Sequence, residues 1–287
     1  MKTTIVSSVA LAIVSAFCIL HSALGQGALT PPSAPAPTMK SLDQVEARTP
    51  VDAIHTPGGA SDEFIISQPG SYYLTTNIVG VSSKRGINIS NNNVTLDLNG
   101  FALLGNPSSL DAIFVNNIFT NITIRNGRIN GWAAAFGVRC FAPYTTVERL
   151  TVTGNLNGVD CAASNCVVRD CIVSGNSKGG IFVVISGGSL VTGNVCVGNN
   201  SSHDANSAGI SISGFNNRID GNHVTGSGTG GYGITVEGGT GNIIVRNSVE
   251  GGGTNYIFDS TQIVGPIITN TVSGIITNVN PWANFSF

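Results

Sequence analysis

Arg139 and Asp160 are the two charged residues whose spacing best suggests chemistry in this chain of 287 residues. Each occupies the third position of one short pattern, Gly137-Val138-Arg139-Cys140 and Gly158-Val159-Asp160-Cys161. If these segments are neighbouring strands, a cation lies beside an acid on the outer face of a sheet. Such a pair is either a surface ion pair that contributes about 0–1 kcal/mol or part of a sugar-binding or acid–base site.

Phe114 and Phe182 occupy the same third position and add aromatic surface to it. Phenyl rings that point out of a sheet can stack on the apolar face of a sugar ring. A glycoside hydrolase needs a second carboxylate near the first, and no carboxylate stacks with Asp160 in this column. We therefore predict Phe114, Arg139, Asp160 and Phe182 as substrate-binding residues and name no catalytic residue.

Cys140 and Cys161 occupy the fourth position, which points inward on adjacent strands. Their Cα atoms would lie about 4.8 Å apart, which allows a disulfide; the alternative is two small apolar core residues. The histidines outside the leader, His55, His203 and His223, are scattered along the chain. We predict no metal site and no cofactor.

The elements that carry these residues are repeats of one pattern. It recurs at steps of 21 to 29 residues, each long enough for two or three short strands. Such a period predicts an all-β parallel β-helix (solenoid) of about eight coils with capped ends, in which successive coils stack strand on strand. The second position of the pattern is Ile87, Ile113, Val138, Val159, Ile181, Ile210, Ile234 and Ile257. The third position is predicted to point outward in every coil, and Phe258 occupies it in the last coil.

A second pattern, an Asn with a Gly four or five residues later, runs out of phase with the first. Stacked Asn side chains can hydrogen-bond along a solenoid as a ladder of amides. The predicted ladder contains Asn126, Asn194, Asn222, Asn247 and Asn270.

The composition excludes other classes of protein. The chain contains 37 Gly and 30 Asn, which are poor in helix interiors and exclude a helical bundle. Charged residues make up 10% and the formal net charge is −2, so the chain has no basic footprint for nucleic acid.

Four segments follow from the organisation of the chain. Residues 1–25 have the short positive start, apolar run and small residues of a signal peptide, and the run is short for a membrane anchor. We therefore expect a secreted protein with no membrane span after cleavage. Residues 26–63 form a Pro/Ala-rich linker and N-terminal segment, 64–280 the β-helix, and 281–287 a C-terminal cap.

Three stretches, Pro69–Thr75, Gly86–Ile89 and Asn93–Phe101, resemble the opening coils of secreted right-handed parallel β-helix proteins of the pectate-lyase-like superfamily. Within it, the chain is most similar to the carbohydrate-associated and copper-site-maturation β-helix repeats. The resemblance covers residues 64–280 and implies a single-stranded, right-handed solenoid. It also implies a polysaccharide or a cell-surface component as partner, because the superfamily includes lyases, hydrolases, epimerases and adhesins.

Three functions are consistent with the sequence. The first is a non-catalytic module that binds carbohydrate or another surface. The second is a polysaccharide lyase, epimerase or glycoside hydrolase acting on the sheet face, which a carboxylate cluster near Arg139 and Asp160 would favour. The third is a structural or adhesive protein, which a continuous apolar face would favour.

Overall fold

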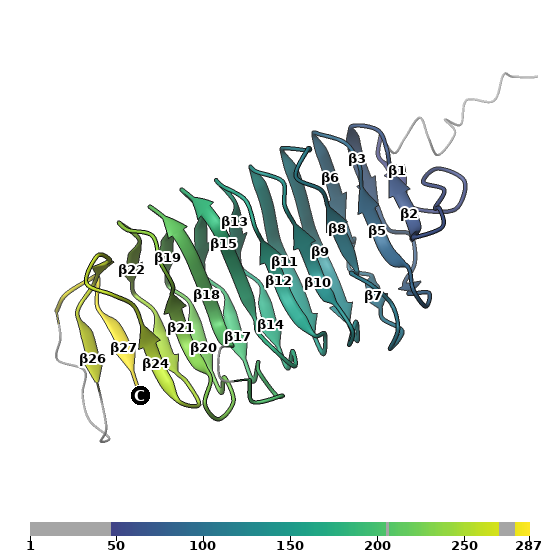
Figure 1. Ribbon diagram of the computed structural model, residues 1–287. Coiled ribbons are helices and arrows are strands. Elements are labelled where there is room, and N and C mark those ends of the chain that lie inside the picture. Colours follow the sequence, from purple (N-terminus) through teal and green to yellow (C-terminus); the bar gives the residue numbers. More distant parts are fainter. Residues whose placement is uncertain (1–46, 205–206, 270–278) are drawn as a thin grey trace, which may run out of the picture. The chain divides into compact units, whose positions relative to one another are not determined.

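Residues 47–204, 207–269 and 279–287 are described by the computed structural model. The predicted signal peptide, most of the linker and Asn270 lie outside these residues. From Arg48 onward the chain is one compact unit, in which coils of parallel strands stack in chain order (Figure 1). This confirms the predicted all-β parallel solenoid.

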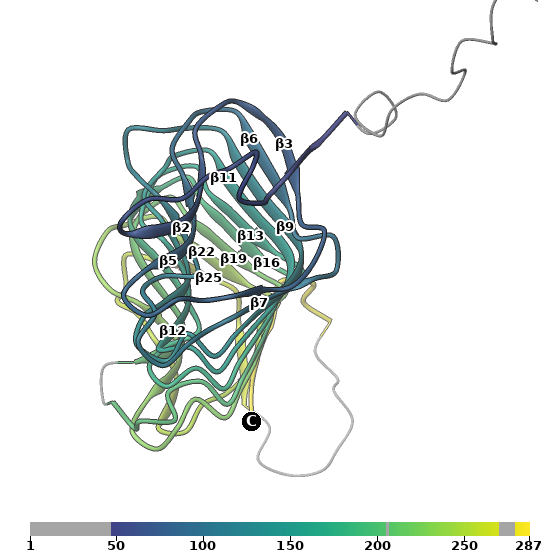
Figure 2. The same cartoon turned by 90° about the vertical axis from the view of Figure 1, so that its right-hand side faces the viewer.

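Each coil gives one strand to a nine-stranded parallel sheet, whose strands lie behind one another in the view along the coils (Figure 2). Its members are β2 (Asp62–Ile66), β5 (Arg85–Ile89), β8 (Ile113–Val115), β10 (Phe136–Cys140), β12 (Asn157–Cys161), β15 (Ile181–Gly187), β18 (Ala208–Phe215), β21 (Tyr232–Val236) and β24 (Thr254–Ile257).

The other strands form one 18-stranded sheet with two faces, joined through the long strands β9 (Ile122–Asn130) and β11 (Thr145–Thr153), which contribute to both. The first face adds β1 (Thr49–Pro50), β3 (Gly70–Tyr73), β6 (Val94–Asp97), β13 (Val167–Arg169), β16 (Leu190–Thr192), β19 (Arg218–Asp220), β22 (Ile243–Val245) and β25 (Ile263–Val264). The second adds β4 (Ile78–Val79), β7 (Ala102–Leu104), β14 (Ile172–Ser174), β17 (Val195–Val197), β20 (His223–Thr225), β23 (Ser248–Glu250), β26 (Ile267–Thr269) and β27 (Asn284–Ser286).

The repeated apolar position forms the core, because the register of the nine-stranded sheet stacks it coil on coil. Ile87 pairs with Ile113, and Val159 pairs with Ile181. These side chains have no exposed surface. Alternation along each strand then sends the next residue outward, which fixes the outer face of the sheet.

The described part of the chain contains nine coils rather than the predicted eight, one for each strand of the nine-stranded sheet. Strand β2 forms the additional coil, in which Phe64 pairs with Ile87. The repeat misses it because Glu63, and not a glycine, precedes Phe64.

The last coil is shifted by one residue from the prediction. Tyr256, not Ile257, pairs with Ile234. Its hydroxyl donates to the carbonyls of Asn247 and Phe285 at 3.0 Å each. The predicted outward position of Phe258 was therefore wrong: this partly buried side chain packs against the core.

Glycine in the Gly-Ile pattern is required by crowding between coils. A Cβ atom on Gly158 would lie 2.4 Å from the carbonyl oxygen of Gly180 and 2.5 Å from Cγ1 of Val173. A Cβ on Gly180 would likewise lie 2.3 Å from the Gly209 oxygen. The glycine column therefore lets adjacent coils approach.

Gly158→Ala should lower the free energy of unfolding by about 2 kcal/mol, because the added methyl overpacks this contact. Gly221→Ala is the control: Gly221 has φ +66° but nothing within 4 Å of its Cβ position, so only backbone strain of about 1 kcal/mol applies. Urea unfolding of both variants checks the prediction. A larger loss at Gly221 would contradict it.

Three amide ladders can be traced among the described residues in the interior of the solenoid. In the first, Asn194, Asn222, Asn247 and Asn284 follow one another, and each Nδ2 donates to the next Oδ1 at 3.0–3.1 Å. The other two are Asn155–Asn176–Asn199 and Asn217–Asn242–Gln262. They satisfy buried polar groups at the corners between strands.

Asn126 does not belong to a ladder, contrary to the prediction. The strand pairing places Gly127 opposite Leu150, so Asn126 lies one residue before the ladder column. It has φ 59°, and its Nδ2 donates to the carboxylate of Asp97 at 3.2 Å. The backbone at this corner is in the left-handed conformation, which Asn adopts more readily than most other residues.

Six of the arginines lie along the first face of the 18-stranded sheet and pair with three buried carboxylates. Asp97 lies between Arg48 and Arg125. In the same way, Glu148 lies between Arg149 and Arg169, and Asp220 between Arg218 and Arg246. Burial raises the pKa of Asp220, but hydrogen bonds from Arg246 and Arg218 together with their charges lower it further, so this pKa lies below its usual value.

The C-terminal segment predicted as a cap contributes a strand. β27 inserts between β23 and β26, and Asn284 ends the first ladder. Ala283 and Asn284 are buried, whereas Trp282 is half exposed.

Candidate functional site

The outer face of the nine-stranded sheet presents two columns of side chains, three residues apart in each strand. Asn157 pairs with Phe136 in the first column, and Asp160 pairs with Arg139 and Phe182 in the second. The sequence prediction considered only the second column. Side chains from both meet at the middle coils.

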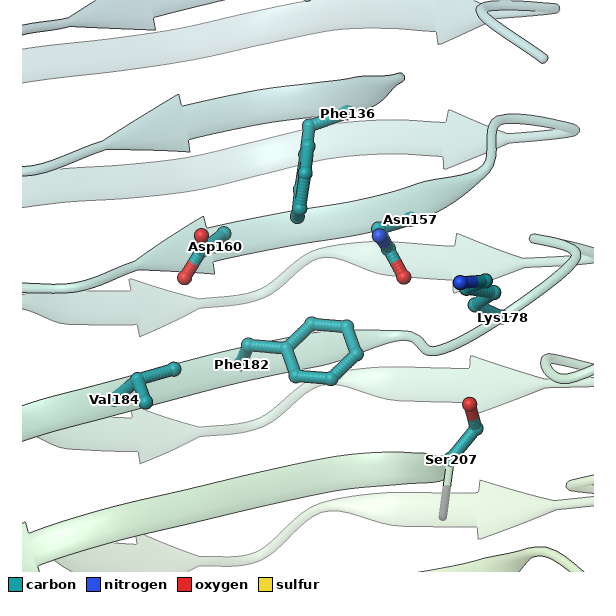
Figure 3. Close-up of a pocket in the computed structure, with 7 residues that line it drawn as sticks. All are labelled: Phe136, Asn157, Asp160, Lys178, Phe182, Val184 and Ser207. Atoms are coloured by element: carbon teal, nitrogen blue, oxygen red, sulfur yellow. The ribbon is translucent and has the colours of Figure 1, made fainter. Parts of the chain in front are cut away.

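Asp160 lies in a hollow of about 230 Å³ on strand β12, the Asp160 hollow. In Figure 3, Asp160 and Asn157 lie between the rings of Phe136 and Phe182, which come from the strands on either side. The ring of Phe182 lies over Gly179, where a Cβ atom would be 2.2 Å from it. The hollow is lined by Phe136, Asn157, Asp160, Lys178, Phe182, Val184 and Ser207.

The carboxyl group of Asp160 is buried in this hollow without a hydrogen bond to its Oδ1 atom. Asp160 as a whole residue is only 8% exposed. Burial raises the pKa of Asp160 to about 6, the Arg139 guanidinium lowers it, and the nearby Asp111 carboxylate raises it. The Asp160 carboxyl therefore takes up its proton near pH 6 rather than near pH 4.

Arg139 and Asp160 do not form an ion pair within 4.0 Å, in contrast to the surface pair considered from the sequence. The Arg139 guanidinium stacks on Phe136 at 4.7 Å and on Phe141 at 5.2 Å from the ring centroids. These contacts turn it toward the preceding coil, where Nη1 lies 4.0 Å from Oδ2 of Asp111. Its buried Nε has no hydrogen-bond partner.

Asp111 provides the second carboxylate that the sequence prediction lacked. It is buried, and its Oδ1 accepts a hydrogen bond from the Phe136 amide at 3.2 Å. The pKa of Asp111 is raised above its usual value, because burial raises it more than that hydrogen bond and the charges of Arg139 and Arg85 lower it. Two carboxyl groups thus lie near one another, with the Arg139 cation within ion-pair distance of Asp111.

A second hollow, of about 380 Å³, adjoins the first and shares Phe136 with it. We name it the Asp111 hollow. Phe114 lies in its wall, but the Arg85 guanidinium covers that ring at 4.3 Å from the centroid. Its lining residues are Arg85, Leu110, Asp111, Phe114, Ala134, Ala135, Phe136 and Arg139.

Four side chains predicted for the site are thus divided between two adjoining hollows, Asp160 and Phe182 in one, Phe114 and Arg139 in the other. The prediction missed Asp111 and Phe136, which lie in the first outward column. Reading the residue three positions before each member of the second column would have found both.

The Cys140–Cys161 disulfide considered from the sequence is absent: both residues are buried free thiols. They pair in register on β10 and β12. The spacing of 4.7–4.9 Å between parallel strands holds their Cβ atoms farther apart than the 3.5–4.5 Å of a disulfide. The Cys140 thiol contacts Oγ1 of Thr145 at 3.2 Å instead.

Within residues 47–204, 207–269 and 279–287, no three His, Cys, Asp or Glu side chains are grouped so that they could hold a metal ion. The same part of the chain contains no helix that is long and apolar enough to cross a membrane.

Residues 65–202 match the family model described as "Right handed beta helix region". The match covers just under half of the chain. Together with the stacked parallel coils, it confirms the right-handed parallel β-helix fold that the resemblance of the opening coils implies. No curated protein matches the chain.

Solved structures similar to this chain include the tailspike protein of E. coli bacteriophage HK620. A double mutant of that protein is 11% identical with a TM-score of 0.33, and a single mutant in complex with a pentasaccharide is 12% identical with a TM-score of 0.29. Each match covers 75% of this chain and 62% of the tailspike chain. The chain therefore spans less than two thirds of the tailspike's length.

Proposed function

We propose that the outer face of the nine-stranded sheet binds a polysaccharide across the Asp160 and Asp111 hollows. The observation that carries this proposal is the buried carboxyl of Asp160, which has an unpaired oxygen and lies between two phenyl rings. Leaving such a group unpaired costs about 1–3 kcal/mol. A sugar hydroxyl would remove that cost.

The chemistry of the walls supports the same ligand. A sugar ring has an apolar face that stacks on aromatic rings and a rim of hydroxyls that needs polar partners. Phe136 and Phe182 offer the first, and Asn157, Asp160 and Lys178 the second. Because the two hollows adjoin across coils, a polymer would fill both.

Hydrolysis of the bound glycan is a second candidate function, favoured by the pair Asp111 and Asp160. Glycosidases use one protonated and one ionised carboxyl group beside the scissile bond. Asp160, with a pKa of about 6, would donate the proton, and Asp111, beside Arg139, would be the ionised partner. Turnover would then fall above pH 6 as Asp160 loses its proton.

A binding screen of residues 26–287 against neutral and acidic polysaccharides, with product detection, tests both functions. Phe136→Ala and Phe182→Ala should each raise the Kd at least tenfold, or about 1.4 kcal/mol. Phe215→Ala is the control, since Phe215 is an exposed phenyl ring of strand β18 that lies outside both hollows.

Each outcome of the screen decides between the functions. Binding without products supports a binding module. New reducing ends that Asp160→Asn abolishes support a hydrolase. Absence of binding to every polysaccharide, or equal losses in Phe136→Ala and Phe215→Ala, would overturn the proposed site.

A further inference from the structure

The first face of the 18-stranded sheet carries six of the nine arginines of the chain. Their side chains are 29–51% exposed, whereas the three carboxylates between them are only 5–8% exposed. This face therefore presents cations to solvent, although the chain as a whole has a formal net charge of −2. We name these residues the arginine row: Arg48, Arg125, Arg149, Arg169, Arg218 and Arg246.

The strand register keeps the arginine row in line along the solenoid. Arg125, Glu148 and Arg169 are neighbours in one ladder, which continues through Thr192 to Asp220. The strands that carry it follow one another coil by coil (Figure 2). From β6 to β19 the ladder takes five strand steps, or about 24 Å.

Two arginines of the row occupy corner positions that glycine suits better. Arg149 has φ 50° and Arg246 has φ 58°, a left-handed conformation that is uncommon in residues other than glycine. Two coils between them have glycine at the same corner, Gly193 and Gly221, also with positive φ. The fold therefore does not require arginine at either position.

The buried carboxylates bind only one edge of the guanidinium groups. Asp220 accepts hydrogen bonds from Nε and Nη2 of Arg246, at 2.6 and 2.5 Å. Glu148 accepts them from the same two atoms of Arg169, at 2.8 and 2.5 Å. Among the described residues, Nη1 of neither arginine has a hydrogen-bond partner. Since a guanidinium has five N–H donors, both arginines are held in place and still have donors for an external anion.

Aliphatic side chains form a second column on the same face. This apolar column lies two residues before the ladder of Arg169 and Asp220, and alternation sends both columns outward. Its members are Val167, Leu190, Ile243 and Ile263, with Arg218 between the second and the third. At its end Ile263 is 58% exposed, and the half-exposed Trp282 stacks on Arg218 and Arg246. The face is therefore amphipathic.

We propose that this face docks on an anionic lipid bilayer as a peripheral contact. The negative surface potential of such a bilayer attracts arginines that lie at the level of the headgroups. Aliphatic side chains and Trp282 would pack between the headgroups, since apolar faces are buried at that boundary. The proposal does not depend on polysaccharide binding, because the two hollows lie on the other sheet.

Other polyanions fit this face less well. Duplex nucleic acid carries one charge for about every 1.7 Å of its axis, whereas the arginine row, its three buried carboxylates and the exposed Asp170 leave a net charge of only +2. An acidic polysaccharide stacks on aromatic rings, but arginines already cover the rings of Tyr73 and Trp282. Neither polymer gives the apolar column a partner.

Vesicle flotation tests the inference. The chain is used without residues 1–25, whose apolar run could itself bind lipid, and it keeps the whole compact unit from Arg48 onward. Vesicles contain phosphatidylcholine alone or equal parts of phosphatidylcholine and phosphatidylglycerol. We expect flotation only with the mixed vesicles, and a bound fraction at least fivefold lower in 1 M NaCl, where charges are screened beyond about 3 Å.

A double variant, Arg149→Gly with Arg246→Gly, removes two guanidinium groups at corners where glycine adopts the backbone readily. Each buried carboxylate keeps one arginine, so the fold is retained, and urea unfolding checks this. The bound fraction should fall at least fivefold. The control is Arg128→Glu, which changes the charge by the same amount on an exposed side chain of the second face and should keep binding within twofold. Ile263→Ser should lower binding at least twofold.

The wild-type chain alone can overturn the inference, whatever the stability of the variants. Absence of flotation, or equal flotation with both kinds of vesicle, would do so. Equal losses in the double variant and in Arg128→Glu would also contradict it. If the chain does not float but binds DNA or an acidic polysaccharide through the arginine row, the partner is that polymer and not a bilayer. Polysaccharide binding that is lost only in Phe136→Ala and Phe182→Ala would leave the proposed function standing.

Discussion

Asn222→Ala should lower the free energy of unfolding by about 4 kcal/mol, the largest loss we expect from a single substitution in this solenoid. The Asn222 side chain accepts hydrogen bonds from the amide and Nδ2 of Asn194, both at 3.0 Å. Its own Nδ2 donates to the Val191 carbonyl and to Asn247 Oδ1, also at 3.0 Å. Truncation removes all four of these buried hydrogen bonds and takes the acceptor from the Asn194 amide, and each buried group left unpaired costs about 1–3 kcal/mol.

Asn126→Gly is the matched control, because it removes an amide of the same type from the corner outside the ladder. Gly accepts the left-handed conformation of this position, and the lost contacts lie at a partly exposed site. We expect a loss below about 1 kcal/mol. Urea unfolding at pH 7 measures both variants, and equal losses would show that the buried ladder has no special role.

The solenoid could be predicted from the sequence because its physical cause repeats. Six of the nine described coils have one buried aliphatic residue preceded by a glycine where backbones approach, and these recur in the printed sequence as Gly-Ile or Gly-Val. Ala112 takes the place of the glycine before Ile113. The first coil, with Glu63 and Phe64, breaks that rule because no glycine stands at its crowded position. Asn126 was misassigned because Asn serves two purposes here, as a ladder amide and as a left-handed corner residue.

The site was harder to predict, since it depends on side-chain direction across coils. Arg139 and Asp160 are neighbours in register, yet the guanidinium turns away because Phe136 and Phe141 offer it two aromatic faces. Asp111 was also not predicted, because it precedes the repeated pattern and belongs to the first outward column, three residues before Phe114. The spacing of the repeats predicts which coil a residue lies on, but it does not predict which neighbour the side chain of that residue contacts.

Asp160→Asn should stabilise the chain at neutral pH, by up to about 3 kcal/mol. Folding buries the Asp160 carboxyl and raises its pKa from 3.8 to about 6. At pH 7.5 the folded chain must therefore hold a charge that burial disfavours. An amide of similar shape carries no such charge.

The sign of the effect follows from proton binding. Between about pH 4 and pH 6 the folded chain binds more protons at Asp160 than the unfolded chain, so the stability of the wild type falls as the pH rises through this range. The gain from Asp160→Asn should be small at pH 4 and reach its full size above pH 6. Urea unfolding at pH 4.0, 5.0 and 7.5 measures it, and a gain independent of pH would contradict the assignment. The pH range over which the gain appears therefore reports the pKa of the Asp160 carboxyl in the folded chain.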